Sequence, residues 1–241
     1  MIRAGRVRLN GRVRRDPETP VRLDRDRIAL DGGVIAPEKK IYLMWNKPRG
    51  LLTTASDEKG RETVYDALEK AGETLQWVAP VGRLDKASEG LLLLTNDSEW
   101  GARIAAPETH LEKTYHVQVK SLAGADLAAA MLRGIRAKDG DFLHAGGARL
   151  LRSGEKNCWL EITLDEGKNR QIRRMLAALE VEVLRLVRVA IGPVALGNLA
   201  KGEFRPLSGE ERMAMDRALA RARPQYLGAT PRTSGFPPSA R

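Results

Sequence analysis

The chain has 241 residues, of which 42% are hydrophobic and 30% charged, and it carries a formal net charge of +10 with a pI near 10.0. This length allows one or two domains with a substantial core, and no stretch approaches the roughly 20 apolar residues that a membrane-spanning helix needs. The first residues lack the apolar core of a secretory signal, so we expect a cytoplasmic protein. Nucleic acid is the commonest partner of so basic a chain, although a soluble protein can be basic without one.

The cysteine and histidine content excludes several kinds of site. Cys158 is the sole cysteine, so the chain has no internal disulfide and no zinc cluster of cysteines. Its apolar neighbours in the sequence predict a buried thiol in a strand rather than a nucleophile. The three histidines, His110, His116 and His144, show no metal-ligand spacing. A zinc-dependent deaminase, which is another class of base-modifying enzyme, is therefore disfavoured.

Residues 1–37 form a basic block that differs from the rest of the chain. Residues 6–13 alternate basic and apolar side chains and include Asn10-Gly11, a dipeptide typical of a tight hairpin turn. A second strand-like stretch covers residues 22–30. Six arginines lie in the first 15 positions: Arg3, Arg6, Arg8, Arg12, Arg14 and Arg15. They form either a solvated strand face or a patch that contacts phosphates, and so short a block must rely on other parts of a protein for a core.

Strands and helices interleave without regular alternation in the remainder of the chain. Apolar or alternating runs predict strands at 41–45, 76–81, 91–94, 113–120, 159–164 and 183–189. Helices are predicted at 62–71, 98–106 and 127–132 and from residue 169 onward. This order favours an α+β fold with a mixed, mainly antiparallel central sheet and flanking helices over a doubly wound fold. Residues 222–241 carry Pro and Gly without apolar periodicity, which predicts a flexible tail.

The first candidate site is the polar loop 82–90, which lies between two apolar strands. A loop in this position is held by rigid neighbours, as catalytic groups often are. Asp85 is flanked by Arg83 and Lys86, and nearby positive charge favours the carboxylate form that a nucleophile requires. The alternative is an ordinary turn aspartate, because the chain contains 31 acidic residues and nothing else yet distinguishes this one.

The second candidate is Tyr115 on the predicted strand 113–120. Aromatic residues make up only 5% of the chain, and a flipped base needs a flat apolar partner. On pattern alone, a core tyrosine that packs beside Val117 and Val119 is the favoured interpretation.

The third candidate is a basic helix that starts near Asn169, the predicted capping residue. Ile172 lies on its apolar face, and Arg170, Arg173 and Arg174 lie on the opposite side. Arginines beside the free N–H groups of a first helical turn could hold a phosphate, a substrate oxygen or a catalytic carboxylate. A solvated basic face fits the pattern equally well.

Taken in this order, the motifs resemble those of the RsuA-type ribosomal pseudouridine synthases. The matching segments are 46–50 (Asn-Lys-Pro-Arg-Gly), 82–85 (Gly-Arg-Leu-Asp) with 88–97, 112–115 (Glu-Lys-Thr-Tyr), 166–175, 188–193 and 199–207. The resemblance covers about residues 1–215, and its Gly-Arg-Leu-Asp loop is highly specific. It implies the pseudouridine synthase fold for residues 38–215 and a partial RNA-binding module, with its hairpin half only, for residues 1–37.

The resemblance also implies a role for individual residues. Asp85 would be the catalytic aspartate, and Tyr115 would stack on the flipped uracil. Arg173 would pair with Asp85, Ile172 would pack near the base, and Arg83 would hold the RNA with its target base extruded. Further RNA contacts are expected from nearby basic side chains: Lys47, Lys86, Lys113, Lys168, Arg170 and Arg174.

The implied reaction is the isomerisation of uridine in ribosomal RNA, a step of RNA processing in ribosome biogenesis. Because the reaction is redox-neutral and consumes no water, it needs no metal and no cofactor. Whether the aspartate attacks the sugar or removes a proton from it stays open. The expected partner is ribosomal RNA or a pre-ribosomal particle, and the protein is expected to be a monomer.

Two other functions compete with this one. A non-catalytic RNA-binding protein would have no use for a carboxylate in its groove, because Asp85 would repel phosphate. A glycosidase-like enzyme needs two carboxylates that flank one bond, and Asp85 and Glu89 are the only close pair, with Glu89 predicted to be a surface loop residue. Segments 99–100 and 112–115 resemble the small-subunit branch and 191–193 the large-subunit branch, with a slight preference for large-subunit RNA.

Overall fold

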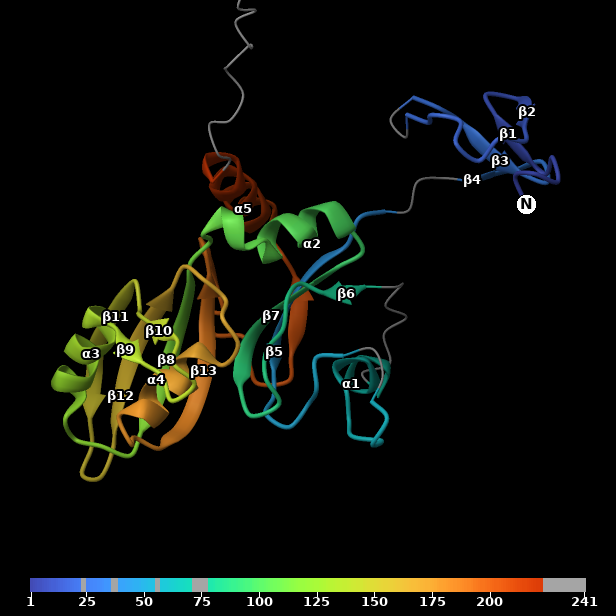
Figure 1. Cartoon of the computed structure of the whole chain (residues 1–241). Helices are drawn as coiled ribbons and strands as arrows, with labels where there is room; N and C mark the ends of the chain where they lie inside the picture. Colours follow the sequence, from blue (N-terminus) through green and yellow to red (C-terminus); the bar gives the residue numbers. More distant parts are fainter. Residues whose placement is uncertain (23–24, 36–38, 55–56, 71–77, 223–241) are drawn as a thin grey trace, which may run out of the picture. The chain divides into compact units, whose positions relative to one another are not determined.

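The structure is a computed structural model that describes residues 1–22, 25–35, 39–54, 57–70 and 78–222 (Figure 1). Contacts between residues divide the chain into two units, Met1–Lys40 and Ile41–Arg241, close to the predicted boundary after residue 37. All but the first residue of the predicted tail 222–241 lies outside the described residues. No helix in the part of the chain that the structure describes combines the length and the apolar character required to cross a bilayer.

The first unit is a four-stranded antiparallel sheet with the strand order β2-β1-β3-β4. Its strands are β1 (Val7–Leu9), β2 (Arg12–Arg14), β3 (Ile28–Leu30) and β4 (Gly33–Ile35). Asn10 and Gly11 connect the first pair with φ angles of 51° and 80°, and Asp31 and Gly32 connect the last pair with 50° and 86°. Positive φ at both central residues matches the right-handed twist of a hairpin. The predicted hairpin at Asn10-Gly11 is confirmed.

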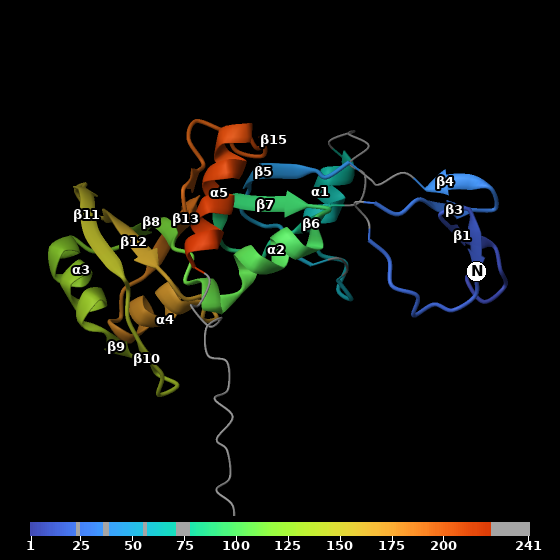
Figure 2. The same cartoon turned by 90° about the horizontal axis from the view of Figure 1, so that it is seen from above.

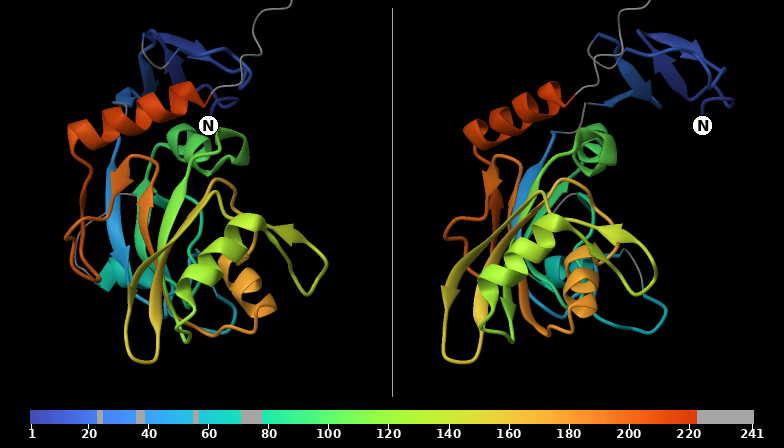
Figure 3. Two further views of the ribbon diagram at one scale, coloured as in Figure 1. Left: turned by 90° about the vertical axis from the view of Figure 1, so that its left-hand side faces the viewer. Right: turned by 60° about the vertical axis from the view of Figure 1, so that its left-hand side comes forward.

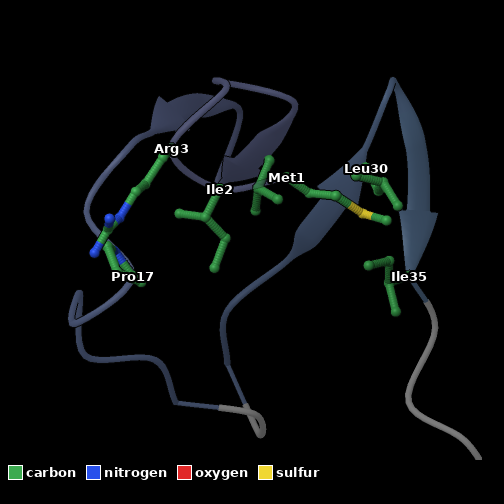
Figure 4. A pocket seen from close by; sticks show the side chains of 7 residues that line it. Met1, Ile2, Arg3, Pro17, Leu30 and Ile35 are labelled. Carbon is green, nitrogen blue, oxygen red and sulfur yellow. The ribbon is translucent and has the colours of Figure 1, made fainter.

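An open apolar hollow of about 520 Å³ lies within this first unit (Figure 4). Its lining residues are Met1, Ile2, Arg3, Val7, Pro17, Leu30 and Ile35. The side chain of Met1 reaches toward Leu30 and Ile35, yet Met1 is 71% exposed and Ile35 52% exposed. The hollow fits the expectation that so short a block cannot bury a core of its own.

The second unit is built on a nine-stranded sheet whose main path runs β11-β12-β8-β13-β7-β5-β15, with β14 on β13 and β6 on β7. Its strands are β5 (Tyr42–Lys47), β6 (Ala79–Pro80), β7 (Glu89–Thr95), β8 (Lys113–Val119), β11 (Gly147–Ser153), β12 (Cys158–Leu164), β13 (Val183–Ile191), β14 (Val194–Ala195) and β15 (Phe204–Pro206). Among the described strands of this sheet, β13 and β7 are the parallel pair and the other pairs are antiparallel. The predicted mixed, mainly antiparallel α+β fold is confirmed.

Helices cover parts of both faces of this sheet. They are α1 (Val64–Lys70), α2 (Ser98–Ala105), α3 (Gly124–Arg133), α4 (Gln171–Ala178) and α5 (Gly209–Arg221), with a 3₁₀ turn at Pro107–Thr109. We call the face that bears Tyr115 and Leu160 the front face. There α3 and α4 cover β8, β11, β12 and β13 (Figure 3), and α1 covers β5 and β7. On the back face α2 and α5 lie side by side over β5 and β7 (Figure 2).

The predicted strands and helices of the second unit are present, with ends shifted by a few residues, although part of the predicted strand 76–81 lies outside the described residues. Helix α5 and the strands β9 (Ile135–Arg136), β10 (Phe142–Leu143), β11, β14 and β15 were not predicted from the sequence. Helix α5 begins with a capping box, in which the Ser208 hydroxyl accepts from the Glu211 N–H and the Glu211 carboxylate accepts from the Ser208 N–H.

Candidate active site

The loop between β6 and β7 carries Asp85, and every carbonyl oxygen from residue 83 to residue 88 accepts a hydrogen bond. The donors are Arg188 Nη1 to Arg83 (3.4 Å), Thr53 Oγ1 to Leu84 (2.7 Å), Ser88 N to Asp85 (2.9 Å), Gly50 N to Lys86 (2.8 Å), Arg173 Nη2 to Ala87 (3.0 Å) and Lys47 Nζ to Ser88 (3.1 Å). These donors come from four separate segments of the chain. A loop bonded at each residue holds its side chains in fixed positions, which is what a catalytic group requires.

One row of residues on the front face of the sheet lies next to this loop. Strand register aligns Lys47 of β5 with Gly90 of β7, Gly90 with Arg188 of β13, and Arg188 with Tyr115 of β8. Gly90 has a φ of 104°, and a Cβ there would lie 2.3 Å from the Arg188 carbonyl oxygen. Only glycine allows this close approach of β7 and β13. The sequence therefore brings the lysine, the arginine and the tyrosine of three distant motifs into one row.

Lys47 is fully buried, and its ammonium donates to the carbonyl oxygens of Pro48, Asp85 and Ser88. Burial lowers the pKa of Lys47 to about 8, against the opposing negative charge of Asp85. Its charged end faces the loop from inside the protein, so Lys47 is poorly placed for the RNA contact expected of it, which stays a prediction. Its position instead allows it to hold the backbone of the catalytic loop.

Arg188 is the second buried cation of the row, and the sequence analysis gave it no role. It is 5% exposed and donates from Nε to the Leu91 carbonyl at 2.7 Å as well as from Nη1 to Arg83. Its Nη2 has no hydrogen-bond partner among the described residues. The signal that could have revealed it is a charged residue in the middle of the otherwise apolar segment 186–191.

The arginine that forms the ion pair with Asp85 is not the one predicted. Arg170 Nη1 lies 3.6 Å from Asp85 Oδ2, whereas Arg173 donates to the Ala87 carbonyl. Arg170, not Asn169, is the residue that precedes the first turn of α4, and its left-handed backbone (φ 48°) has no side-chain cap. Burial lowers the pKa of Arg173, as does the charge of Arg170, while Asp85 opposes the shift. Arg173 thus interacts with the aspartate through charge but binds the backbone of its loop.

Tyr115 is half-buried on the front face and packs against the core that α3 and α4 cover. Ile172 of α4 is 3% exposed and belongs to the same core. The ring thus has the core contacts of the simpler interpretation and retains partial exposure. Its stacking on a uracil stays a prediction, as does the position of Ile172 near the base.

The other basic candidates differ in how freely their charges face solvent. Arg83, Lys86 and Lys168 are exposed, and Lys168 lies 3.1 Å from Glu166. Lys113 is half-buried, and burial lowers its pKa with help from the charge of Arg188. The exposed members remain suitable for contacts with phosphate.

Arg174 forms ion pairs with two carboxylates of the same chain. Its Nη2 lies 2.6 Å from oxygens of both Asp139 and Asp141, which precede β10, so the side chain links α4 to the β9–β10 hairpin. Both carboxylates raise the pKa of Arg174. Because its charge is already compensated, this arginine is poorly suited to the RNA contact expected for it.

Glu89 is a buried residue of β7 and not the surface loop residue that was predicted. It is 4% exposed and forms ion pairs with Arg185 at 2.8 Å and Lys201 at 2.7 Å. Burial alone would raise the pKa of Glu89, but these two cations lower it below its ordinary value. Glu89 pairs with Val187 on the back face of the sheet. The next residue, Gly90, belongs to the row with Lys47 on the front face, so Glu89 points away from that row. The glycosidase-like alternative thereby loses its second carboxylate.

Metal-ligating side chains do not gather in the described part of the chain, where no group of three or more His, Cys, Asp or Glu residues could hold an ion. Cys158 is fully buried, and burial raises the pKa of its thiol, as expected for a cysteine that packs in a strand.

Comparison with known proteins assigns the chain to a family. The family model described as RNA pseudouridylate synthase matches residues 41–178. A protein of Aquifex aeolicus named as an uncharacterized RNA pseudouridine synthase is 37% identical over 220 residues, or 91% of this chain and 87% of that protein. A protein of Bacillus subtilis named ribosomal large subunit pseudouridine synthase B is 36% identical over 222 residues, or 91% of this chain and 88% of that protein.

A solved structure described as a pseudouridylate synthase is 32% identical, with a TM-score of 0.62 over 89% of this chain and 90% of that one. The fold and the class of enzyme expected from the sequence motifs are therefore both confirmed. The chain belongs to the family of RNA pseudouridylate synthases, enzymes that convert uridine in RNA to pseudouridine.

Proposed function

We propose that this protein isomerises specific uridines of ribosomal RNA to pseudouridine and that Asp85 is the catalytic carboxylate. The observation that carries this proposal is the fixed loop 83–88, whose six carbonyl oxygens are all hydrogen-bonded. Asp85 is the acidic residue of that loop, and its side chain is 35% exposed. A carboxylate that is both held in place and accessible meets the first requirement of the reaction.

The reaction makes three demands on the site. The bond between the ribose C1′ and the ring N1 must break, the ring must turn, and a bond must form between C1′ and the ring C5, which gives up its hydrogen while N1 gains one. Asp85 serves this sequence either by attack on C1′ or by removal of a sugar proton, since both routes need an ionised and oriented carboxylate. Arg170, at 3.6 Å from Asp85, supports that orientation.

Three buried or half-buried cations position the loop and do not touch the substrate. Lys47 binds the carbonyls of Asp85 and Ser88, Arg188 binds that of Arg83, and Arg173 binds that of Ala87. Hydrogen bonds from a charged donor are about twice as strong as neutral ones, so these contacts resist displacement of the loop during turnover. We assign these three residues a positioning role.

The exposed cations around the loop supply the RNA contacts. Arg83 and Lys86 lie on either side of Asp85, and Arg170 and Lys168 precede α4. A uridine stacked and paired inside a duplex cannot present its ribose and ring to the Asp85 carboxylate, so the target nucleotide must be extruded. Tyr115 is the aromatic residue in the row beside this loop and is suited to stack on the extruded uracil.

Ribosomal RNA of the large subunit is the proposed substrate, because the Bacillus subtilis relative is named for that subunit. A role in ribosome biogenesis, a cytoplasmic location, a monomeric state and RNA binding by residues 1–37 also remain predictions from the sequence. The arginines of that first block support the last of these, since they add positive charge outside the catalytic unit.

The test compares wild-type protein and Asp85→Asn on unmodified ribosomal RNA transcripts of both subunits, with pseudouridine mapped by chemical probing and primer extension. We expect a stop at a defined uridine with the wild type alone, preferably in large-subunit RNA. Equal stops with both proteins would remove Asp85 from the catalytic role. Tight RNA binding without any stop would favour the alternative of a non-catalytic RNA-binding protein.

A further inference from the structure

The back face of the large sheet has two halves with different coverings. Over β5 and β7, α2 and α5 bury an apolar cluster. Over β11, β12, β8 and the start of β13, the back face instead carries exposed charged side chains, with Arg149 66% exposed and Arg185 47% exposed. An uncovered face is common in antiparallel sheets and is usually only solvated, so the details of this half decide whether it has a function.

Strand register arranges the uncovered half in two rows. The first row runs Arg152, Trp159, Gln118 and Arg185 across β11, β12, β8 and β13. The second row runs Arg149, Glu161, His116 and Val187 across the same strands. We call these eight residues the back-face rows. They place three arginines around one tryptophan on a surface that none of the described helices of this unit covers.

Two arginines of the back-face rows are fixed through Nε and have their terminal nitrogens available. Arg149 and Arg185 each bind a carboxylate through Nε, Arg149 to Glu161 at 2.7 Å and Arg185 to Glu89 at 2.8 Å. Their terminal nitrogens have no hydrogen bond within the described ranges. Because the guanidinium is planar and rigid, fixing Nε orients the remaining N–H donors toward an external acceptor.

Trp159 orders a further guanidinium. The Arg152 carbon Cζ lies 4.9 Å from the centre of the Trp159 ring, and that of Arg185 lies 5.6 Å from it. Both distances fall within the range of cation–π attraction. Arginine stacked on an aromatic side chain loses little further freedom when it binds a phosphate, so its contribution to binding increases.

We infer that the back-face rows bind the sugar–phosphate backbone of a second segment of the substrate RNA, away from the target nucleotide. This inference rests on the proposed function for the identity of the substrate. The backbones of Arg149 and Arg152 on β11 are separated from that of Arg185 on β13 by three interstrand spacings, or about 14 Å. The guanidinium groups of Arg152 and Arg185 both approach the Trp159 ring, while that of Arg149 lies beside Glu161 in the second row, so together they offer a cationic surface to a run of phosphates. Positive charges outnumber negative ones on this surface. The rows contain three arginines and one carboxylate, that of Glu161, and Lys201 adds a cation beside Glu89. This excess favours a polyanion as the partner.

The experiment measures the affinity of full-length protein for an unmodified large-subunit ribosomal RNA transcript at several salt concentrations. The test variant is Arg149→Gln with Arg152→Gln. Arg185 is left in place, because without it buried Glu89 would lose one of its two cationic partners. The matched control is Arg217→Gln with Arg221→Gln, which removes two exposed charges from α5. Thermal unfolding checks that both variants fold.

We expect the test variant to bind about tenfold more weakly near physiological salt and to lower the slope of log affinity against log salt by about 1.5, since each phosphate contact contributes about 0.7–0.9. The control variant should match the wild type. Equal slopes for test variant and wild type, or an equal loss in the control, would overturn the inference. Pseudouridine formation by the wild type is scored separately, so that a failure of the proposed function is visible as absent product and not as an unchanged slope.

Discussion

The front and back faces of the large sheet use cationic side chains in opposite ways. On the front face Lys47 and Arg188 are almost completely buried and donate to carbonyl oxygens of the loop that carries Asp85. On the back face Arg149 and Arg185 bind carboxylates through Nε and leave their outer nitrogens exposed. The burial of a cation thus separates residues that shape the protein from residues available to a partner.

This difference teaches how to interpret a basic sequence. Positive charge alone favoured RNA contact for Lys47 and Arg174 as much as for Lys86, yet the first two have partners inside the protein. Removing a front-face cation leaves buried carbonyls unpaired and should impair turnover, because each such group costs about 1–3 kcal/mol. Removing Arg149 or Arg152 from the back face should weaken RNA binding and leave the fold intact.

The largest effect is expected from Gly90→Ala, which breaks the front face itself. A Cβ at this position would meet the Arg188 backbone at 2.3 Å, and the φ of 104° is strained for alanine. We expect a loss of unfolding free energy of about 3–5 kcal/mol, measured by urea denaturation. Gly50→Ala is the matched control, because Gly50 has a φ of 105° with nothing near its Cβ position. An equal loss in the two variants would show that backbone strain alone matters.

The next effect is that of Lys47→Met, which removes the buried ammonium while it retains most of the side-chain volume. The loop then loses the hydrogen bonds from Lys47 to the Asp85 and Ser88 carbonyls, and the Asp85 carbonyl keeps only its bond from the Ser88 N–H. We expect kcat to fall about 100-fold with KM for RNA nearly unchanged, since small displacements of catalytic groups have effects of this size. Lys86→Met, which changes an exposed lysine of the same loop, should instead raise KM. If Lys47→Met acted mainly on KM, the contrast between buried and exposed cations would fail.

The pKa of Lys47 adds a test of the same contact. Burial lowers this pKa to about 8 from 10.5, so the ammonium loses a proton, and one of its donors, as the pH rises through 8. We expect kcat to fall above pH 8 in the wild type and this limb to be absent in Lys47→Met. Between pH 8 and 10.5 the unfolded chain binds more protons at this lysine, so its contribution to stability rises with pH. A parallel fall of activity and stability would therefore point to other groups.

Much of the catalytic unit was predictable from local pattern. Residues 91–94 form a continuous apolar run, and all of β7 is buried. The Ser208–Glu211 capping box of α5 was also visible in the sequence but was overlooked. Strand β11 escaped prediction for a physical reason: all of its residues are half-buried or exposed, so it has no apolar periodicity to detect.

The candidate site was less predictable, because its contacts join residues far apart in the chain. Asp85 and Tyr115 were found as motifs, but the alignment of Lys47, Gly90 and Arg188 with Tyr115 in one row depends on the register of four strands. Likewise, the ion pair with Asp85 is formed by Arg170, which precedes α4 with a left-handed backbone, rather than by Arg173. Local sequence does not encode such long-range register.

The smallest effects are expected from the two aromatic residues that lie on opposite faces, Tyr115 and Trp159. Tyr115→Ala removes the proposed stacking surface and should lower kcat/KM about 10- to 100-fold, which corresponds to about 1–3 kcal/mol per stacked base. Tyr115→Phe keeps the ring and should stay within about threefold of the wild type. Trp159→Phe, on the back face, keeps an aromatic ring beneath Arg152 and should change only the affinity for long RNA, by a similar small factor.

Single-turnover kinetics on one transcript would separate the two aromatic residues. Equal losses in Tyr115→Phe and Tyr115→Ala would contradict the stacking role and point to the hydroxyl group of Tyr115. A fall in kcat for Trp159→Phe would show that the back face affects the chemical step. The expectation that this face acts on RNA binding alone would then be wrong. Agreement with both expectations would assign the chemical step and binding of the target nucleotide to the front face and a second RNA contact to the back face of the same sheet.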